Sequence, residues 1–548
     1  MLTQDSICVV LRGAMLVCGV TALVGLATAL LVFVHHRVRQ LPLRKLNGPP
    51  IPSLWLGHYR QMFNPASPKF HDYFSKTYGT VARLYAFLGD TQLLISDTRA
   101  CHHILVKDAE FFEQPAYVTE ANRHSFGPSI LATHGAQHRR QRKQLTPAFS
   151  IKNMRTLAPL FQELARQCRC MISSKLDEDQ EIDILDPLNR LAIELIAQGG
   201  LGYSFGSFDG RQNEFGRAMR SFGPTIIKLA VWRSFLPVIS TTVPAKLMRS
   251  IATLLPWTTM HNLMGICDSI YKNSVTLYNE KKKMLEMGDE VLKSHITHGN
   301  DIISVLLKSN LDATESKLPD EEILAQMSML ILAATNTTSS ALSRILYTLA
   351  QNPEAQDRLR SELTETRGEA DEPLDYDQLV ELPYLEAVCR ETLRLHPPVN
   401  FITRVAQKDI TIPLSQPITT TDGDTVSTLY VPRNTSIFVN IYGMNRDANI
   451  WGPDADVWKP ERWLAPLPES VLAARIPGVY SNTLTFSGGG RACIGFKFSQ
   501  LEMKVALAEL LTHFRFSLSK HEITWRFGGL IIPSADGDIK LPMVVERV

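Results

Sequence analysis

A long stretch without any charged residue lies near the N-terminus of the chain, from Gly13 to Val34, and it is rich in Leu, Val and Ala. A helix of this length spans roughly 33 Å, which is enough to cross a hydrocarbon core of about 30 Å. The pattern therefore predicts a transmembrane anchor at residues 13–34. A cleaved signal peptide is the alternative, because residues 27–29 read Ala-Thr-Ala, which is typical of a cleavage site. Five more apolar residues follow, and this extra length favours the anchor.

The charges that flank this stretch predict its orientation. Arg12 precedes it, whereas four basic residues follow it: Arg37, Arg39, Arg44 and Lys45. Basic residues collect on the cytosolic side of a membrane span. We therefore expect residues 1–12 to be a short lumenal segment and the rest of the chain to be cytosolic, on a single-pass anchor in the endoplasmic reticulum membrane.

Beyond the anchor, the pattern divides the chain into a hinge and one large body. Residues 46–52 are dense in proline, so they cannot be helical and they act as a stiff spacer. The sequence predicts a basic and proline-rich hinge over residues 35–57 and a catalytic body over residues 58–548. Within the body, residues 78–96 have the β-type content of a small sheet.

For two later segments, residues 224–257 and 281–300, the sequence pattern predicts whether the side chains are buried or exposed. Residues 224–257 are apolar but are interrupted by prolines and basic residues, so they are too broken to span a bilayer. They fit either the core of the body or a surface that dips into lipid. Residues 281–300 are charged and begin with three lysines, and we expect an exposed loop there.

One helix is predicted to be buried on every side. Acidic residues at positions 320–322 suit a helix N-terminus, and residues 323–338 carry no charge. The threonines within this segment have two interpretations. A threonine inside a helix can bond back to the carbonyl four residues earlier and bend the helix, or its hydroxyl can serve a site.

The overall composition excludes some partners and suggests a compartment. The 57 basic and 55 acidic residues nearly balance, so the charge gives no indication of nucleic-acid binding. The eight cysteines lack the close, regular spacing of a disulfide framework, which fits a reducing compartment.

Cys493 differs from an ordinary buried cysteine in its surroundings. Three glycines precede it, one follows it, and a helical apolar pattern begins directly afterwards. The cysteine therefore lies in a tight loop before a helix N-terminus, where backbone N–H groups and the helix dipole lower the pKa of a thiol. Such a thiolate serves as a nucleophile, a zinc ligand or a haem ligand. Zinc needs further Cys or His residues at short spacing, and none follows.

Residues 486–495 have the pattern Phe-x-x-Gly-x-Arg-x-Cys-x-Gly, with Phe486, Gly489, Arg491, Cys493 and Gly495 at the fixed positions. In this pattern the chain resembles the cytochrome P-450 superfamily, whose haem-binding loop has the same form. The resemblance implies a mainly α fold with a small β region, and haem b bound through the thiolate of Cys493. Arg491 would then hold a haem propionate.

The resemblance assigns further haem contacts. Arg142 lies on a basic helical stretch that begins at residue 135, and it matches a propionate-binding arginine of the family. His138, four residues earlier, stands where the family usually has Trp. Arg404 matches another propionate-binding position.

Residues 333–338 match the family segment that crosses the oxygen-binding face of the haem. Ala333 and Ala334 are the small residues that leave room for dioxygen, and Thr337 matches the threonine that helps to deliver protons. Asn336 replaces the usual acid. Since an amide cannot relay a proton as a carboxylate does, the proton route differs from that of the family.

Glu391 and Arg394 lie three residues apart in a helix that stops before two prolines at 397–398. In the family this pair is buried and is completed by an arginine that corresponds to Arg462. The resemblance thus implies a structural ion-pair network that holds the cysteine loop.

These features predict a monooxygenase that inserts one oxygen atom of O₂ into a hydrophobic small molecule by hydroxylation or epoxidation. No nicotinamide or flavin segment is visible, so electrons must come from NADPH through a cytochrome P-450 reductase, with cytochrome b5 as a further candidate partner. Lys143, Lys497 and Lys504 are the candidate docking contacts.

Residues 301–307 and the Leu541-Pro542 pair resemble those of fungal microsomal members of secondary metabolism. The expected substrate is hydrophobic, such as a terpenoid, because the segments named next are largely apolar; aromatic and fatty-acid substrates are the alternatives. Family analogy places substrate contacts at residues 117–131, 333–337, 399–403 and 527–531. Two alternatives remain open: an oxygen-independent haem-thiolate isomerase or dehydratase, and a non-catalytic haem-binding protein.

Overall fold

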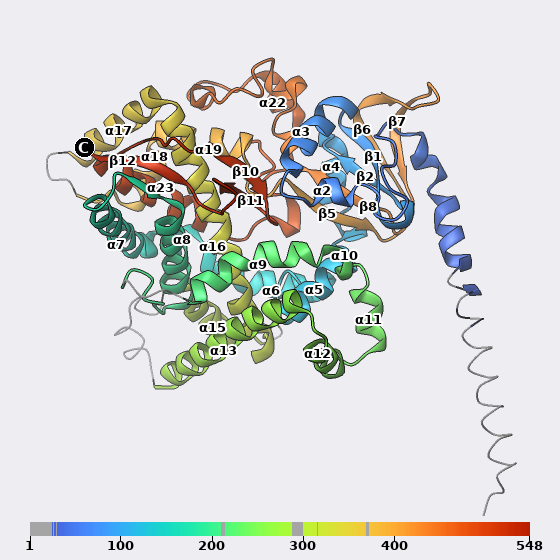
Figure 1. Cartoon of the computed structure of the whole chain (residues 1–548), viewed down its shortest axis with the longest axis horizontal. Coiled ribbons are helices and arrows are strands. Elements are labelled where there is room, and N and C mark those ends of the chain that lie inside the picture. Colours follow the sequence, from blue (N-terminus) through green and yellow to red (C-terminus); the bar gives the residue numbers. More distant parts are fainter. Residues whose placement is uncertain are drawn as a thin grey trace, which may run out of the picture.

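The computed structural model describes residues 23, 25, 27–28, 30–209, 214–287, 300–314, 316–368 and 372–548. Most of the long helices gather in one part of the molecule, and the largest sheet lies in the other part, with the helices α2 to α4 beside it (Figure 1). The described chain is therefore mainly α with a small β region, which confirms the fold class predicted from the sequence.

Helices of ten residues or more make up the larger part. They are α3 (Ser67–Tyr78), α5 (Ala116–Phe126), α6 (Gly135–Leu145), α7 (Ile151–Leu176), α8 (Leu185–Glu194), α9 (Glu214–Lys228), α12 (Ala245–Leu254), α13 (Thr258–Met287), α15 (Ile302–Asp312), α16 (Asp320–Gln351), α17 (Pro353–Arg367), α19 (Pro383–Leu395) and α23 (Phe496–His513). Shorter helices connect them: α2 (Tyr59–Met62), α4 (Thr98–His102), α10 (Ala230–Arg233), α11 (Leu236–Thr242), α18 (Tyr376–Glu381), α20 (Ile441–Met444), α21 (Ala448–Trp451) and α22 (Glu469–Ala474).

The largest sheet has five strands in the order β1-β2-β8-β5-β3. Its strands are β1 (Val81–Tyr85), β2 (Thr91–Ile95), β3 (Phe112–Glu113), β5 (Phe401–Ala406) and β8 (Ser436–Asn440). The predicted β content of residues 78–96 is confirmed, because β1 and β2 pair antiparallel with Val81 opposite Ile95. Every residue of β2 is buried, as expected for a strand inside a sheet.

Three smaller sheets complete the β structure. One joins β4 (Glu181–Asp183), β12 (Pro542–Arg547) and β9 (Phe514–Leu518), and two are hairpins: β6 (Ile410–Thr419) with β7 (Thr425–Val431), and β10 (Thr524–Phe527) with β11 (Ile531–Ser534).

Helix α16 runs through the helical part and packs against α8, α13, α19 and α23. Its first turn carries three acidic residues, which favour the positive end of the helix dipole. Most of its later residues are buried, from Ile323 to Ala350. The predicted buried helix is therefore present. Because α16 lies in the middle of the helical part, a cavity next to it would be lined by its side chains.

The N-terminal prediction falls largely outside the described residues. Of the anchor proposed at residues 13–34, the structure describes residues 23, 25, 27–28 and 30–34. Among the helices that the structure describes, none has the length and apolar character needed to cross a bilayer.

The proline-rich segment is irregular, as predicted, but it is docked on the body. Leu43 and Leu46 are buried, and the backbone N–H of Arg83 donates to the carbonyl of Asn47 at 2.8 Å. A side chain at Gly48 would come within 2.4 Å of the Arg83 carbonyl oxygen. Residues 43–48 thus extend the surface of β1 instead of standing clear of it as a spacer.

Residues 224–257 lie mostly at the surface, so the core interpretation is wrong for this segment. Leu229 is buried, but the large apolar side chains of α10 to α12 are open, with Trp232, Val238 and Leu254 exposed by 58%, 65% and 85%. These helices pack on α5, α9 and α13 along one edge, which leaves their outer faces uncovered.

The exposed loop predicted for residues 281–300 is also wrong at its start. Helix α13 continues to Met287, and Lys281 is buried. Its ammonium lies 2.6 Å from the Asp301 carboxylate and 3.0 Å from the Ser304 hydroxyl. The sequence did not show that this lysine has a buried partner; residues 288–299 lie outside the described part.

We expect Asp301→Asn to destabilise the protein by about 3–5 kcal/mol, because the amide still caps α15 but leaves Lys281 as an uncompensated buried charge. Asp268→Asn is the matched control, since Asp268 pairs with Arg249 at the surface and should lose at most about 1 kcal/mol. Urea unfolding followed by circular dichroism measures both. Equal losses in the two variants would contradict this account.

Candidate active site

The cysteine loop at residues 486–495 is held by close backbone contacts. The backbone N–H of Cys493 donates to the Phe486 carbonyl at 2.9 Å and closes the loop. A Cβ at Gly488 would lie 1.7 Å from the Pro477 carbonyl oxygen, and one at Gly489 would lie 1.8 Å from the Leu105 carbonyl oxygen. Two of the glycines are therefore required because other backbone passes directly against them.

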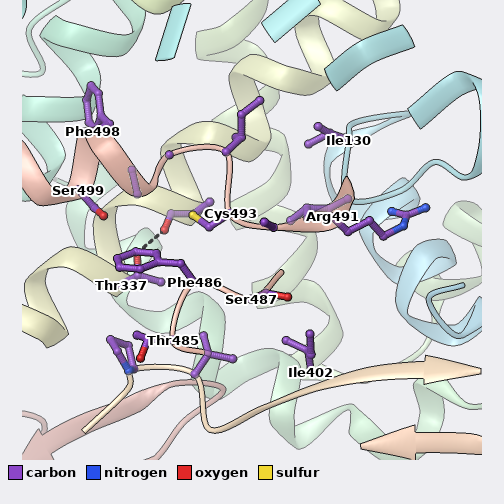
Figure 2. Close-up of a pocket in the computed structure, with 18 of the residues that line it drawn as sticks. Ile130, Thr337, Ile402, Thr485, Phe486, Ser487, Arg491, Cys493, Phe498 and Ser499 are labelled. Carbon is purple, nitrogen blue, oxygen red and sulfur yellow. Dashed lines mark hydrogen bonds between the residues drawn. The ribbon is translucent and has the colours of Figure 1, made fainter. Parts of the chain in front are cut away.

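The loop forms one wall of a cavity of about 490 Å³, a size typical of small-molecule sites. The facing wall comes from α16, and further lining comes from α5, α6 and β5. Cys493, Phe486 and Thr337 all line the cavity, and the Arg491 side chain points away along the loop (Figure 2). The lining is mostly apolar and includes Ile130, Leu330, Phe401, Ile402 and Phe498.

The Cys493 thiol opens onto this cavity, and the protein alone does not lower its pKa. Burial raises the pKa of the thiol, whereas the Gly495 backbone N–H and the Arg142 charge act in the opposite direction. The expectation of a lowered pKa from the helix N-terminus is thus wrong for the protein without its ligand. A metal bound to the sulfur would supply the missing stabilisation, because a coordinating thiol is deprotonated outright.

Four basic side chains line the cavity: His138, Arg142, Arg404 and Arg491. Arg491 already has an anionic partner, since it donates to the Glu113 carboxylate at 2.7 Å and to the Thr133 carbonyl at 2.9 Å. Burial acts against the ionisation of Glu113, but His134 and Arg491 lower the pKa of its carboxyl to about 2.

Arg142 and Arg404 lack such a partner. Arg142 donates to the Ala492 carbonyl at 2.6 Å, and Arg404 donates to the Thr403 carbonyl at 2.8 Å. In the part of the chain that the structure covers, neither forms an ion pair with a carboxylate. Burial lowers the pKa of Arg404 to about 10 and that of His138 to about 4, so His138 is neutral near pH 7. One buried cation, Arg404, and one partly buried cation, Arg142, thus face the cavity and lack anions among the described residues.

On the opposite wall, Ala333, Ala334 and Thr337 line the cavity. The Thr337 hydroxyl donates to the carbonyl of Ala333, four residues earlier, at 2.7 Å. Thr337 therefore makes the hydrogen bond back to its own helix and also lines the cavity, so both interpretations of this threonine hold. Asn336, which was predicted to be catalytic, is not among the lining residues. Its replacement of the usual acid therefore does not alter the wall of this cavity.

A buried ion pair supports the loop from behind. Arg394 donates two hydrogen bonds of 2.8 Å to Glu391, and both side chains are fully buried. Arg462 lies 3.5 Å from Glu391. The backbone N–H of Lys459 and the Trp463 indole donate to the same carboxylate at 3.0 Å each. Every charge in this group is thus hydrogen-bonded, which is the condition for a buried pair to be tolerated.

Asn445 and Thr485 connect this network to the loop. Arg394 donates to the Asn445 carbonyl at 2.8 Å. The Asn445 side chain accepts from the Leu484 backbone N–H at 2.8 Å and donates to the Thr485 hydroxyl at 2.9 Å. Sequence reasoning missed both residues, and it missed Glu113, because their partners are far away along the chain and no local motif marks them.

Two other expectations are corrected by the structure. Lys504 is buried and lies 2.8 Å from the Glu386 carboxylate, so it is not a docking contact for a reductase. Residues 527–531 do not line the cavity, whereas Val118, Leu131, Val399 and Thr403 from the other predicted substrate segments do.

These residues fit a haem group. The thiol at the cavity wall is a ligand for iron, and the unpaired cations Arg142 and Arg404 suit two propionates. Small side chains at Ala333 and Ala334 leave space on the far side. A neutral, apolar ligand alone would leave both arginines without a partner, and this costs free energy in a buried site.

Comparison with known proteins agrees with this geometry. Residues 47–540 match the family model described as cytochrome P-450. The chain is 41% identical over 538 residues to cytochrome P-450 monooxygenase 91 of Postia placenta, which covers 97% of this chain and 98% of the relative. It is 41% identical over 534 residues to a ganoderic acid synthetase of Ganoderma lucidum, covering 96% and 97%.

Members of this family bind haem through a cysteine thiolate and receive electrons from a reductase partner. The match extends over nearly the whole chain, and it includes the cysteine loop, α16 and the buried ion pair. The chain belongs to the cytochrome P-450 family of monooxygenases.

Proposed function

We propose that this monooxygenase acts at a membrane surface and inserts one oxygen atom into an apolar, terpenoid-like small molecule, with Cys493 as the iron ligand. The observation that carries the proposal is the Cys493 thiol, which faces an apolar cavity that also holds two cations without anions. When bound, a haem with a thiolate ligand supplies the oxygen-activating chemistry, because the thiolate favours cleavage of the O–O bond.

The residues of this chain bind and orient the reacting groups. Arg142 and Arg404 would hold the propionates, and Arg491, although paired with Glu113, would add its positive charge to theirs. His138 would pack beside them, and Phe486 would cover the sulfur. The glycines at 489 and 495 allow the loop to approach the haem. The Thr337 hydroxyl can turn from the Ala333 carbonyl and donate a proton into the cavity, whereas Asn336 lies outside its wall.

The chemistry of the lining supports an apolar substrate. The side chains beyond the haem contacts are chiefly Ile, Leu, Val and Phe, so burial of apolar surface supplies most of the affinity. A relative named as a ganoderic acid synthetase supports a substrate of fungal secondary metabolism.

A membrane location is supported by the uncovered apolar face of α10 to α12 and by the uncharged sequence at residues 13–34. Large exposed apolar patches mark membrane or protein contacts. We assign the enzyme to the endoplasmic reticulum membrane with the body in the cytosol. Its proposed electron donors are an NADPH-dependent cytochrome P-450 reductase and, as an accessory, cytochrome b5. Lys143 is exposed and Lys497 is partly exposed, so both are open to a docking partner.

The function predicts that oxygen consumption depends on NADPH and on the reductase, and that it yields oxygenated product. The purified protein, the reductase and a panel of terpenoids should be combined, with oxygen followed by electrode and product by mass spectrometry. Turnover without the reductase would indicate the isomerase or dehydratase alternative. A complete lack of turnover across the panel would indicate a haem-binding protein.

Thr337→Ala should lower the ratio of product to oxygen consumed by roughly a hundredfold, the lower end of the range for a positioned proton donor. Thr337→Ser keeps the hydroxyl and should retain most of the coupling. Thr335→Ala is the structural control, because Thr335 makes the same type of back-bond to Ile331 but is fully buried. If Thr335→Ala and Thr337→Ala changed the ratio equally, the hydroxyl of Thr337 would have no role in proton delivery.

A further inference from the structure

Arg233 is a partly buried cation without an anionic partner among the described residues, away from the haem contacts. It ends α10, and its Nε atom is buried without any hydrogen-bond partner. Tyr117 is the one ionisable side chain that raises its pKa, while burial lowers it. Among the residues that the structure describes, no carboxylate pairs with this guanidinium.

The surroundings within the protein do not compensate this charge. The guanidinium carbon lies 6.0 Å from the centre of the Tyr117 ring, which is the outer limit of a cation–π contact. Such a contact is weak compared with the cost of a buried charge that lacks a partner. By contrast, Arg249 on the neighbouring α12 is paired with Asp268. The missing partner of Arg233 is therefore expected to come from outside the residues that the structure describes.

Arg233 is linked to the active-site cavity through α5. Tyr117 lies near enough to Thr403 for that side chain to act against the raised pKa of the phenol, and Thr403 lines the cavity, as does Val118, the residue after Tyr117. Helix α10 packs directly on α5, and the two helices lie side by side in Figure 1. Arg233 itself does not line the cavity; it faces Tyr117, whose neighbour Val118 is part of the cavity wall.

We propose that Arg233 binds a carboxylate of the substrate, so that the enzyme takes an apolar molecule that carries an acid group. This inference rests on the proposed function and specifies its substrate class. Arginine matches a carboxylate with two parallel N–H donors. The apolar part of the molecule would lie in the cavity towards Cys493, and the acid would lie at the α5–α10 end.

A lipid phosphate is the other anion available near this surface, because α10 to α12 expose apolar side chains. The position of Arg233 favours the substrate. Its Nε is fully buried, and its neighbour Tyr117 reaches a residue that lines the cavity, whereas Trp232, the adjacent residue, is the one that is open to the outside.

The test compares acids with the corresponding alcohols on the haem-loaded protein. The probes are dodecanoic acid, hexadecanoic acid and abietic acid, each with its primary alcohol, and the dissociation constants come from the change in haem absorption. The native protein should bind each acid about tenfold or more tightly than its alcohol, since charge-assisted hydrogen bonds are the strong ones. Arg233→Met should remove this preference and leave the affinity for the alcohols unchanged, while Arg233→Lys should keep part of it.

Lys228→Met is the matched control, because it removes one positive charge from the exposed end of α9 and should preserve the acid preference. Haem content and alcohol binding report whether each variant is folded and whether the proposed function holds, independently of Arg233. Equal affinities for acids and alcohols in the native protein would overturn the inference. So would a preference that survives in Arg233→Met. Partition to phosphatidylserine vesicles that falls in Arg233→Met with an unchanged acid preference would assign Arg233 to lipid instead.

Discussion

The position of one sulfur atom at the wall of an apolar cavity is the constraint on which the rest of the structure depends. Cys493 is kept there by a loop whose glycines pass directly against the carbonyls of Pro477 and Leu105. Side chains at these positions would push the loop away. Behind it, the buried pair Glu391 and Arg394 holds the chain that leads into the loop through Asn445 and Thr485.

The second important feature is a set of arginine side chains that have no anionic partner among the described residues. Where the fold needs a charge for its own stability, it supplies a partner, as with Lys281 and Asp301 or Arg394 and Glu391. Arg404 is buried and Arg142 and Arg233 are partly buried, and the described chain supplies no anionic partner for any of them. The first two lie where a haem would place its propionates, and the third lies near the end of the substrate cavity. The same cost of an uncompensated charge thus indicates a ligand in each case.

The features that the sequence predicts well are those with a local pattern. The cysteine loop, the uncharged segment of α16 and the pair Glu391 and Arg394 are each marked by residues that are close together in the sequence, and the resemblance to the family assigned the loop and the pair their roles. The features that it misses depend on contacts across the chain. Lys281 and Lys504 read as solvated lysines but are buried against Asp301 and Glu386. The open faces of α10 to α12 have the same composition as a core, because composition does not record which neighbours are present.

The bond between the Cys493 sulfur and an iron atom is the central claim, and X-ray absorption at the iron edge of the purified protein tests it directly. We predict one sulfur neighbour of the iron, together with nitrogen neighbours from a porphyrin, and loss of the sulfur signal in Cys493→Ser. An iron with only nitrogen or oxygen neighbours, or a sulfur signal that persists in the variant, would contradict the account.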